Sequence, residues 1–101
     1  MKKGELFNNI LELVAQETDL SQFEITSKSR IAEIVDARCL FVRLLSDVGF
    51  YPSDIAKRIN LTQRAVNYIL TDFDSRISTR KYLRNCYEKL KKHTSNNSFM
   101  G

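Results

Sequence analysis

The sequence has few of the residues that interrupt helices. Its 101 residues include three glycines and one proline, and apolar and polar residues alternate strictly over no stretch. Glycine and proline mark turns, and a two-residue alternation marks half-buried strands. Hydrophobic residues make up 43% of the chain, which is enough to form a hydrophobic core without disulfides or a structural metal. The sequence therefore predicts a compact, all-α, multi-helix domain.

The chain is also poor in metal-binding and disulfide-forming residues. Cys39 and Cys86 are isolated thiols, and His93 is the only histidine. Zinc sites gather four such ligands, commonly in close pairs, so we expect no metal and no cofactor. The cysteines are expected to stay free in a reducing compartment, although the sequence alone leaves a disulfide between them open.

Long hydrophobic runs are absent as well. No stretch approaches the roughly 20 apolar residues of a membrane span. Glu5, Asn8 and Asn9 interrupt the N-terminal stretch, which does not match a secretory signal peptide. These features predict a cytoplasmic protein. No nucleophile stands with a base and no carboxylate pair suggests an active site, so we expect no enzyme.

Charge is present but unevenly distributed. Residues 1–25 carry two Lys/Arg and five Asp/Glu, a net −3, and residues 26–101 carry fourteen and seven, a net +7. The two parts sum to the formal net charge of +4. A basic region of this kind is typical of nucleic-acid binding, and a merely solvated basic surface is the alternative.

The stretch at residues 52–70 has the pattern of a helix-turn-helix, with helices at about 52–59 and from about 63 to 70 or beyond. Ala56 is the small residue that lets the helices pass closely. Asn60 stands where the turn needs a residue that tolerates positive φ. The apolar positions are Ile55, Ile59, Leu61, Val66 and Ile69. An αα-hairpin used only for packing is the alternative.

Three further helices are predicted. An acidic amphipathic helix at residues 5–17 would cover the core. The stretch 30–47 is apolar nearly all round its second half, which predicts a buried central helix that ends at Gly49. An acidic break at 71–77 would separate the helix-turn-helix from a last helix at 79–92. The apolar stripe of that helix is Tyr82, Leu83, Cys86, Tyr87 and Leu90.

A short turn precedes the central helix. Ser21 and Glu24 have the spacing of a capping box, and Phe23 and Ile25 are expected to pack into the core. At the other end, the polar residues 94–101 are predicted to form a disordered tail. One domain, residues 1–93, is therefore expected.

Several cations sit where packing alone does not explain them. Lys28 and Arg30 precede the central helix, where a positive charge opposes the helix dipole; a phosphate or a minor groove would favour them there. Serines in the same segment could cap the helix, and a solvated loop is the alternative. Arg38 interrupts the apolar helix and must reach solvent, pair with Asp36 or Glu33, or meet a ligand.

The run at residues 14–45 resembles the C-terminal DNA-binding domain of DnaA, the bacterial chromosomal replication initiator. The matching features are Val14-Ala15, Ser21, the segment Ser27-Lys28-Ser29-Arg30, and Ile34-Val35 followed by Arg38. With the helix-turn-helix at the family's distance, the resemblance covers about residues 7–75. It implies a Trp-repressor-like helix-turn-helix fold, with Arg30 in a minor groove and Arg38 near the phosphate backbone.

The sequence departs from that family in two respects. The family's signature Gly-Gly-Arg-Asp-His-Thr-Thr-Val opens its recognition helix, whereas this chain has a shorter stretch, residues 60–66, that shares mainly Val66. The family's origin sequence therefore does not carry over. No Gly-x-x-x-x-Gly-Lys-Ser/Thr phosphate loop is present either.

These observations predict a monomeric, sequence-specific double-stranded DNA-binding domain in replication or transcription control, with replication or regulatory proteins as further partners. The predicted DNA-binding residues are Lys28, Arg30, Arg38, Lys57, Arg58, Thr62, Gln63, Arg64, Asn67 and Tyr68. Thr62 would cap the recognition helix, and Lys57 and Arg58 would hold phosphates. Tyr68 could instead be a half-buried packing residue.

About five phosphate contacts would give a log–log salt slope near −4 to −5. The alternative function is a helical protein-interaction module that retains the fold without binding DNA. In that case the basic face would meet an acidic partner.

Overall fold

Helix α3 (Ala32–Asp47) is the centre of the molecule. In the computed structural model, which describes residues 2–96, α3 packs against each of the other five helices. Eight of its residues are buried, and the largest, Phe41, is fully so. The prediction of a buried central helix is confirmed.

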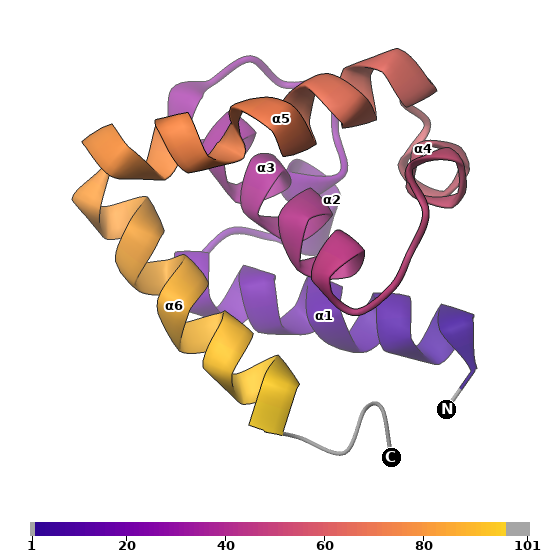
Figure 1. Cartoon of the computed structure of the whole chain (residues 1–101), viewed down its shortest axis with the longest axis horizontal. Helices are drawn as coiled ribbons and strands as arrows, with labels where there is room; N and C mark the ends of the chain where they lie inside the picture. The colour runs from indigo at the N-terminus through magenta and orange to yellow at the C-terminus, as the bar shows by residue number, and fades with distance from the viewer. Residues whose placement is uncertain (1, 97–101) are drawn as a thin grey trace.

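The other helices surround α3. They are α1 (Lys3–Thr18), α2 (Gln22–Ile25), α4 (Pro52–Ile59), α5 (Gln63–Thr79) and α6 (Lys81–Asn96). Figure 1 shows α1 along the bottom, α5 across the top, α6 down the left side and α4 at the right. Residues 2–96 contain helices and no strand. This confirms the predicted all-α, multi-helix domain.

Local sequence signals set most helix ends. Ser21 and Glu24 form the predicted capping box, each accepting a hydrogen bond from the other's backbone N–H. Gly49 follows α3 with φ of 107°, a conformation that glycine adopts without strain. Pro52 is the first residue of α4, where its missing N–H has no helical acceptor to lose.

The acidic break predicted at residues 71–77 is wrong, because α5 continues without interruption to Thr79. Phe73 is fully buried there. Asp72 and Asp74 lie on the helix surface and pair with Arg76 and Arg43. Acidic residues that find cationic partners on the helix surface therefore do not end the helix.

Two aromatic residues expected in the core are exposed instead. Phe23 is 81% exposed and Tyr82 is 65% exposed, whereas Ile25 is fully buried as predicted. Because α2 is a single turn, it directs only one of its two large apolar side chains inward. Tyr82 lies at the edge of the apolar stripe of α6, whose other four members are buried.

The C-terminal boundary also differs from the prediction. Helix α6 extends to Asn96, and Thr94 is buried with its hydroxyl donating to the Lys91 carbonyl at 3.0 Å. Residues 94–96 therefore belong to the helix, and the rest of the predicted tail lies outside the described residues.

Cys39 and Cys86 are buried and free, as expected. Burial raises the pKa of both thiols. None of the helices described here is long and apolar enough to cross a membrane.

Candidate nucleic-acid interface

A three-residue turn joins α4 to α5. Asn60 adopts φ 57° and ψ 45°, the left-handed conformation expected of it, and its N–H donates to the Ala56 carbonyl. The N–H of Leu61 donates to the same carbonyl at 3.0 Å. Ala56 is buried. In Figure 1, α4 is seen nearly end-on and α5 lies across the view, so the two helices cross steeply.

Thr62 caps α5, as predicted. Its hydroxyl oxygen accepts a hydrogen bond from the Ala65 N–H at 3.0 Å. This bond satisfies one of the backbone donors at the start of the helix. The contribution of Thr62 to the site is therefore to hold the start of the helix in place.

The first half of α5 has one buried face and one exposed polar face. Val66 is fully buried, and Ala65 and Ile69 are half-buried. Gln63, Arg64 and Asn67 are exposed, and Tyr68 is 67% exposed, so it is no half-buried packing residue. These four side chains form no hydrogen bond or ion pair with any other described residue.

The two cations of α4 differ from each other. Lys57 is exposed and pairs with no carboxylate in the described part of the chain. Arg58 is engaged internally: its Nε lies 3.2 Å from Oδ1 of Asp54, and its guanidinium lies over the rings of Phe7 and Phe50. Arg58 therefore has internal partners on α1, on α4 and in the connection before α4, and its phosphate contact stays a prediction.

Arg38 is likewise engaged inside the protein. Its Nε donates to the Ile25 carbonyl and its Nη2 to the Ser29 carbonyl, both at 3.1 Å. Burial lowers the pKa of this guanidinium. The side chain pairs with neither Asp36 nor Glu33. Arg38 thus holds the connection between α2 and α3, and the phosphate contact implied by the resemblance stays a prediction.

That connection carries Lys28 and Arg30, both exposed and without an ion pair among residues 2–94. Ser27 and Ser29 shape it through short-range bonds: the Ser27 hydroxyl accepts from the Ser29 N–H, and the Ser29 hydroxyl accepts from the Ile31 N–H. The serines therefore order the connection instead of capping α3, whose N-cap Ile31 makes no side-chain bond. In Figure 1 the connection follows the same upper edge as α5, behind it.

The ten predicted residues thus fall into two sets. Arg38, Arg58 and Thr62 are used internally. The other seven are exposed, with no polar partner among the side chains that the structure describes: Lys28, Arg30, Lys57, Gln63, Arg64, Asn67 and Tyr68. We call these seven the α5 face, although Lys57 belongs to α4, and Lys28 and Arg30 to the connection before α3.

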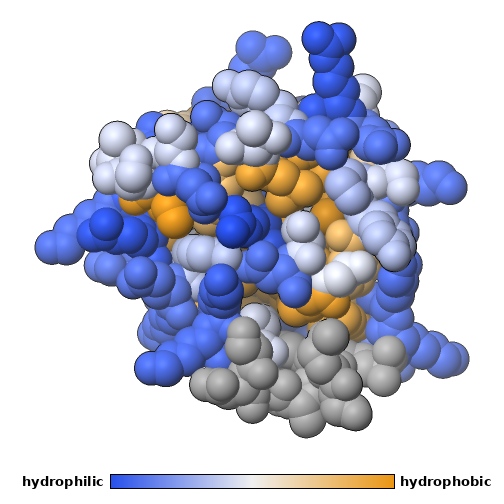
Figure 2. All heavy atoms as spheres, in the orientation of Figure 1, coloured by the Kyte–Doolittle hydropathy of each residue, from blue (hydrophilic) through white to orange (hydrophobic). Residues whose placement is uncertain are grey.

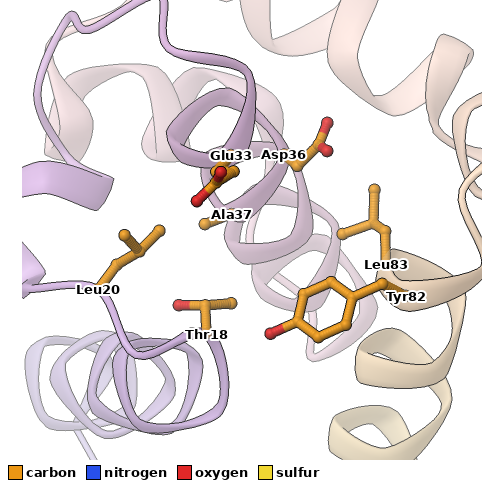
Figure 3. A pocket seen from close by; sticks show the side chains of 7 residues that line it. All are labelled: Thr18, Leu20, Glu33, Asp36, Ala37, Tyr82 and Leu83. Carbon is orange, nitrogen blue, oxygen red and sulfur yellow. The ribbon is translucent and has the colours of Figure 1, made fainter.

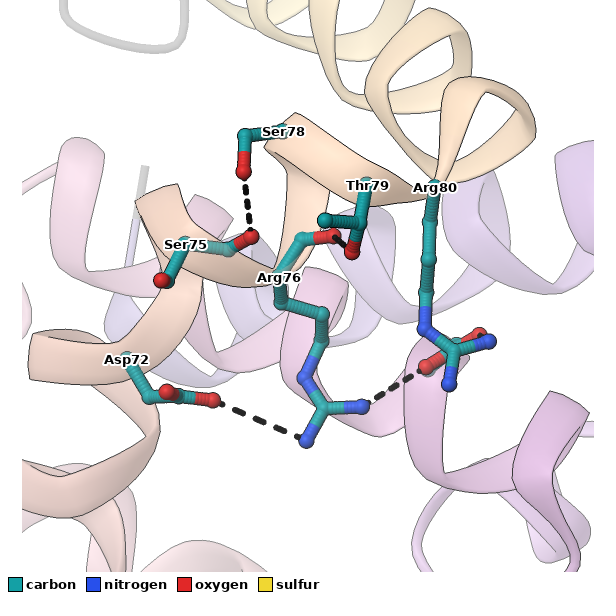
Figure 4. A network of polar contacts seen from close by, with 7 residues as sticks. Asp72, Ser75, Arg76, Ser78, Thr79 and Arg80 are labelled. Atoms are coloured by element: carbon teal, nitrogen blue, oxygen red, sulfur yellow. Dashed lines mark hydrogen bonds and ion pairs between the residues drawn. The ribbon is translucent and has the colours of Figure 1, made fainter.

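Sequence reasoning missed an arginine cluster at the end of α5. Oδ1 of Asp36 lies 2.9 Å from Arg76, and Oδ2 of the same carboxylate lies 3.2 Å from Arg80. Figure 4 shows both guanidinium groups pointing to one carboxylate, with Asp72 on the other side of Arg76 at 3.8 Å. Pairing between residues about 40 positions apart leaves no local sequence signal.

Arg43 forms a second cluster between α3, α5 and α6. Its guanidinium pairs with Asp47 at 3.1 Å and with Asp74 at 3.2 Å. It also lies over the rings of Phe73 and Tyr87. The Tyr87 hydroxyl donates to Asp47 at 2.7 Å, and burial together with this bond raises the pKa of Tyr87.

A small cavity lies away from the α5 face. It has a volume of about 230 Å³ and is lined from α1, α3, α6 and the residues that follow α1. Figure 3 shows Glu33 and Asp36 on one side and Thr18 and Tyr82 on the other. The described residues that line it include no histidine or cysteine. Its carboxylate Asp36 is already bound by two arginines.

The described residues contain no group of three His, Cys, Asp or Glu side chains that could hold a metal ion. Comparison of the chain with protein-family models, with curated proteins and with solved structures found no match.

Proposed function

We propose that this chain is a sequence-specific double-stranded DNA-binding domain whose α4 and α5 form a helix-turn-helix. The observation that carries the proposal is the first half of α5, where polar side chains project from a helix anchored on its other face. Gln63 and Asn67 can pair with adenine in two-bond geometry, and Arg64 can pair with guanine. Their lack of internal partners means that no bond is lost on binding.

The flanking cations would position the domain on the duplex. Lys57 at the end of α4 and Lys28 are suited to hold phosphates, and Arg30 is suited to a minor groove beside the site. Arg38 would act indirectly, because it holds the segment that carries Lys28 and Arg30. Three such cations give a log–log salt slope near −3 from this face. This slope is less steep than the value of about −4 to −5 for five phosphate contacts, because Arg38 and Arg58 have partners within the protein.

The biological role rests on the resemblance of residues 14–45 to the DnaA domain. It favours a stand-alone DnaA-like domain in the control of replication or transcription. Because the recognition helix carries its own residues, the target sequence differs from that of the family. The domain would act as a monomer, with other replication or regulatory proteins as partners.

Selection from a random duplex library tests the proposal. We expect one enriched site. Arg64→Ala should then relax the preference at one or two positions by about 1–3 kcal/mol. Lys57→Ala should weaken all sequences alike, and Lys2→Ala, at an exposed position before α1, is the matched control. The absence of binding to any duplex at low salt would sink the proposal.

A protein-interaction module is the second candidate, because large apolar side chains are exposed near the α2–α3 connection. Phe23 is 81% exposed and Ile31 is 62% exposed. Exposed aromatic residues of this kind are enriched at protein interfaces. Under this alternative the selection would return no enriched site, and Arg64→Ala would leave duplex binding unchanged.

A further inference from the structure

Helix α6 carries charge equal to the whole net charge of the protein. It contains five Lys/Arg and one acidic residue, Glu88, so its formal charge is 5 − 1 = +4. The complete chain has a net charge of +4. The residues outside α6 therefore sum to zero, and α6 supplies +4 of the +7 that residues 26–101 carry.

The cations of α6 lie on its outer side. Its inner side is buried through Leu83, Cys86, Tyr87 and Leu90. At 100° per residue, the five cations and Glu88 fall within an arc of about 160° opposite that buried side. The helix thus has an apolar face committed to the core and a basic face directed to solvent.

Two of the five cations have a partner within the protein. Lys89 pairs with Glu17 at 3.1 Å, and the Lys91 ammonium lies over the Tyr87 ring at 5.4 Å. Lys81, Arg84 and Lys92 are exposed, and no carboxylate among residues 2–94 lies within ion-pair distance of them. We call these three residues the α6 face.

The α6 face lies apart from the start of α5. In Figure 1, α4 and the first turns of α5 are at the upper right, whereas α6 descends along the left side. Segments that are separated in a projection are separated at least as far in space. Figure 2 shows hydrophilic side chains standing out from that left side as well as from the upper edge.

We propose that the α6 face is a second, sequence-independent contact for the phosphate backbone of a DNA duplex. Lys81 and Lys92 are eleven residues apart, which is about 16 Å along a helix. Along the duplex axis, that length equals the rise of about five nucleotides of one strand, at about 3.4 Å each. The inference extends the proposed function, but it does not need α5 to recognise a sequence.

The composition of the α6 face favours phosphates over two other partners. A helix that lies on a membrane buries an apolar face in lipid, whereas the apolar face of α6 is buried in the core. Lysine is depleted at protein interfaces, where aromatic and apolar anchors supply most of the energy. Lysine and arginine supply most phosphate contacts, and such contacts carry no sequence information directly.

The test compares two variants with the same net charge of +1. One neutralises the α6 face with Lys81→Gln, Arg84→Gln and Lys92→Gln. The control changes exposed positions before and on α1 and α2, with Lys2→Gln, Asn8→Asp and Gln22→Glu. The probe is a 20-base-pair duplex of scrambled sequence, titrated over a range of salt concentrations and followed by fluorescence anisotropy.

The α6 variant should lose about 2.7 from the log–log salt slope, which is 0.9 for each of three phosphates. The control should keep its slope within about 0.5 of the parent, because a distant charge releases no counterion. Glu88→Gln should act in the opposite sense and tighten binding about twofold to fivefold. Equal losses in both triple variants, or an unchanged slope in the α6 variant, would overturn the inference.

A further variant separates this inference from the proposed function. Arg64→Ala with Asn67→Ala should remove sequence preference and leave the contribution of α6 intact. If that double variant has no effect while the α6 variant loses duplex binding, the proposed function fails and the inference stands. If the α6 variant instead loses binding only to anionic vesicles or to polyglutamate, the inference fails.

Discussion

The two halves of α5 belong to one continuous helix and are used in different ways. In residues 63–70 the polar side chains project into solvent and find no partner among the described side chains. In residues 71–79 the charged side chains are paired with other helices: Arg76 with Asp36, and Asp74 with Arg43. Both halves have a fully buried apolar anchor, Val66 in the first and the larger Phe73 in the second. The ring centroid of Phe73 lies 4.9 Å from that of Tyr87.

This contrast distinguishes cations that are held by contacts within the protein from cations that are exposed and can bind a partner. An arginine that is already bound by carboxylates, carbonyls or aromatic rings would lose those contacts on binding a phosphate, whereas an exposed cation without such a partner loses only water. Arg38, Arg43, Arg58 and Arg76 belong to the first kind. The α5 face and the α6 face belong to the second kind.

The largest expected effect is on the anchored half. Phe73→Ala should lower the free energy of unfolding by about 3–5 kcal/mol, because it leaves a cavity among α3, α5 and α6. The matched change in the exposed half is Tyr68→Ala, which should alter stability by less than about 0.5 kcal/mol. Urea denaturation followed by circular dichroism measures both. Similar losses would mean that the two halves do not differ as described.

A second prediction concerns the hydroxyl of Tyr87, whose ring packs against Phe73 in the second half of α5. Tyr87→Phe removes the bond to Asp47 and should cost about 2 kcal/mol near neutral pH. The folded protein raises the pKa of Tyr87 above its ordinary value of 10.0, through burial first and the bond to Asp47 second. Above pH 10 the unfolded chain therefore loses this proton while the folded chain keeps it, and stability falls as pH rises.

Urea midpoints measured from pH 8 to pH 11 would test this sign. The parent should lose stability above about pH 10 relative to Tyr87→Phe, which lacks the titrating group. A constant difference between the two proteins over that range would contradict the prediction.

The third prediction concerns Thr62, which caps the start of α5. Thr62→Ala should lower stability by about 1 kcal/mol, because the Ala65 N–H loses its acceptor. Thr62→Ser retains a hydroxyl and should remain close to the parent. Both are read from urea denaturation, and duplex affinity should follow the same order. A Thr62→Ser protein as unstable as Thr62→Ala would show that the methyl group, and not the cap, matters.

The smallest expected change in stability lies on the exposed polar positions. Gln63→Ala and Asn67→Ala should each shift the free energy of unfolding by less than about 0.5 kcal/mol, since neither side chain has an internal partner. Their effect should appear in duplex binding instead, with discrimination reduced by about 1–3 kcal/mol at adenine positions. A marked loss of stability would contradict this prediction and would show that these side chains have a structural role.

Local chemistry made much of the fold predictable. The capping box at Ser21, the left-handed Asn60, Pro52 at the start of α4 and the Thr62 cap all depend on residues a few positions apart. The exposed face of the first half of α5 followed from the same short-range periodicity. The full length of α5 could not be predicted in this way. Asp72 and Asp74 suggest the end of a helix when their partners Arg76 and Arg43 are not known.

The local sequence therefore predicts where most helices begin, the turn between α4 and α5, and the exposed polar residues that follow this turn. These features come from hydrogen bonds and steric limits within one or two turns of chain. Only the tertiary structure decided which cations are available. Packing brings two carbonyls to Arg38 and two aromatic rings to Arg58. Lys57, Arg64 and the α6 face meet none among the residues that the structure describes, because the fold directs them outward.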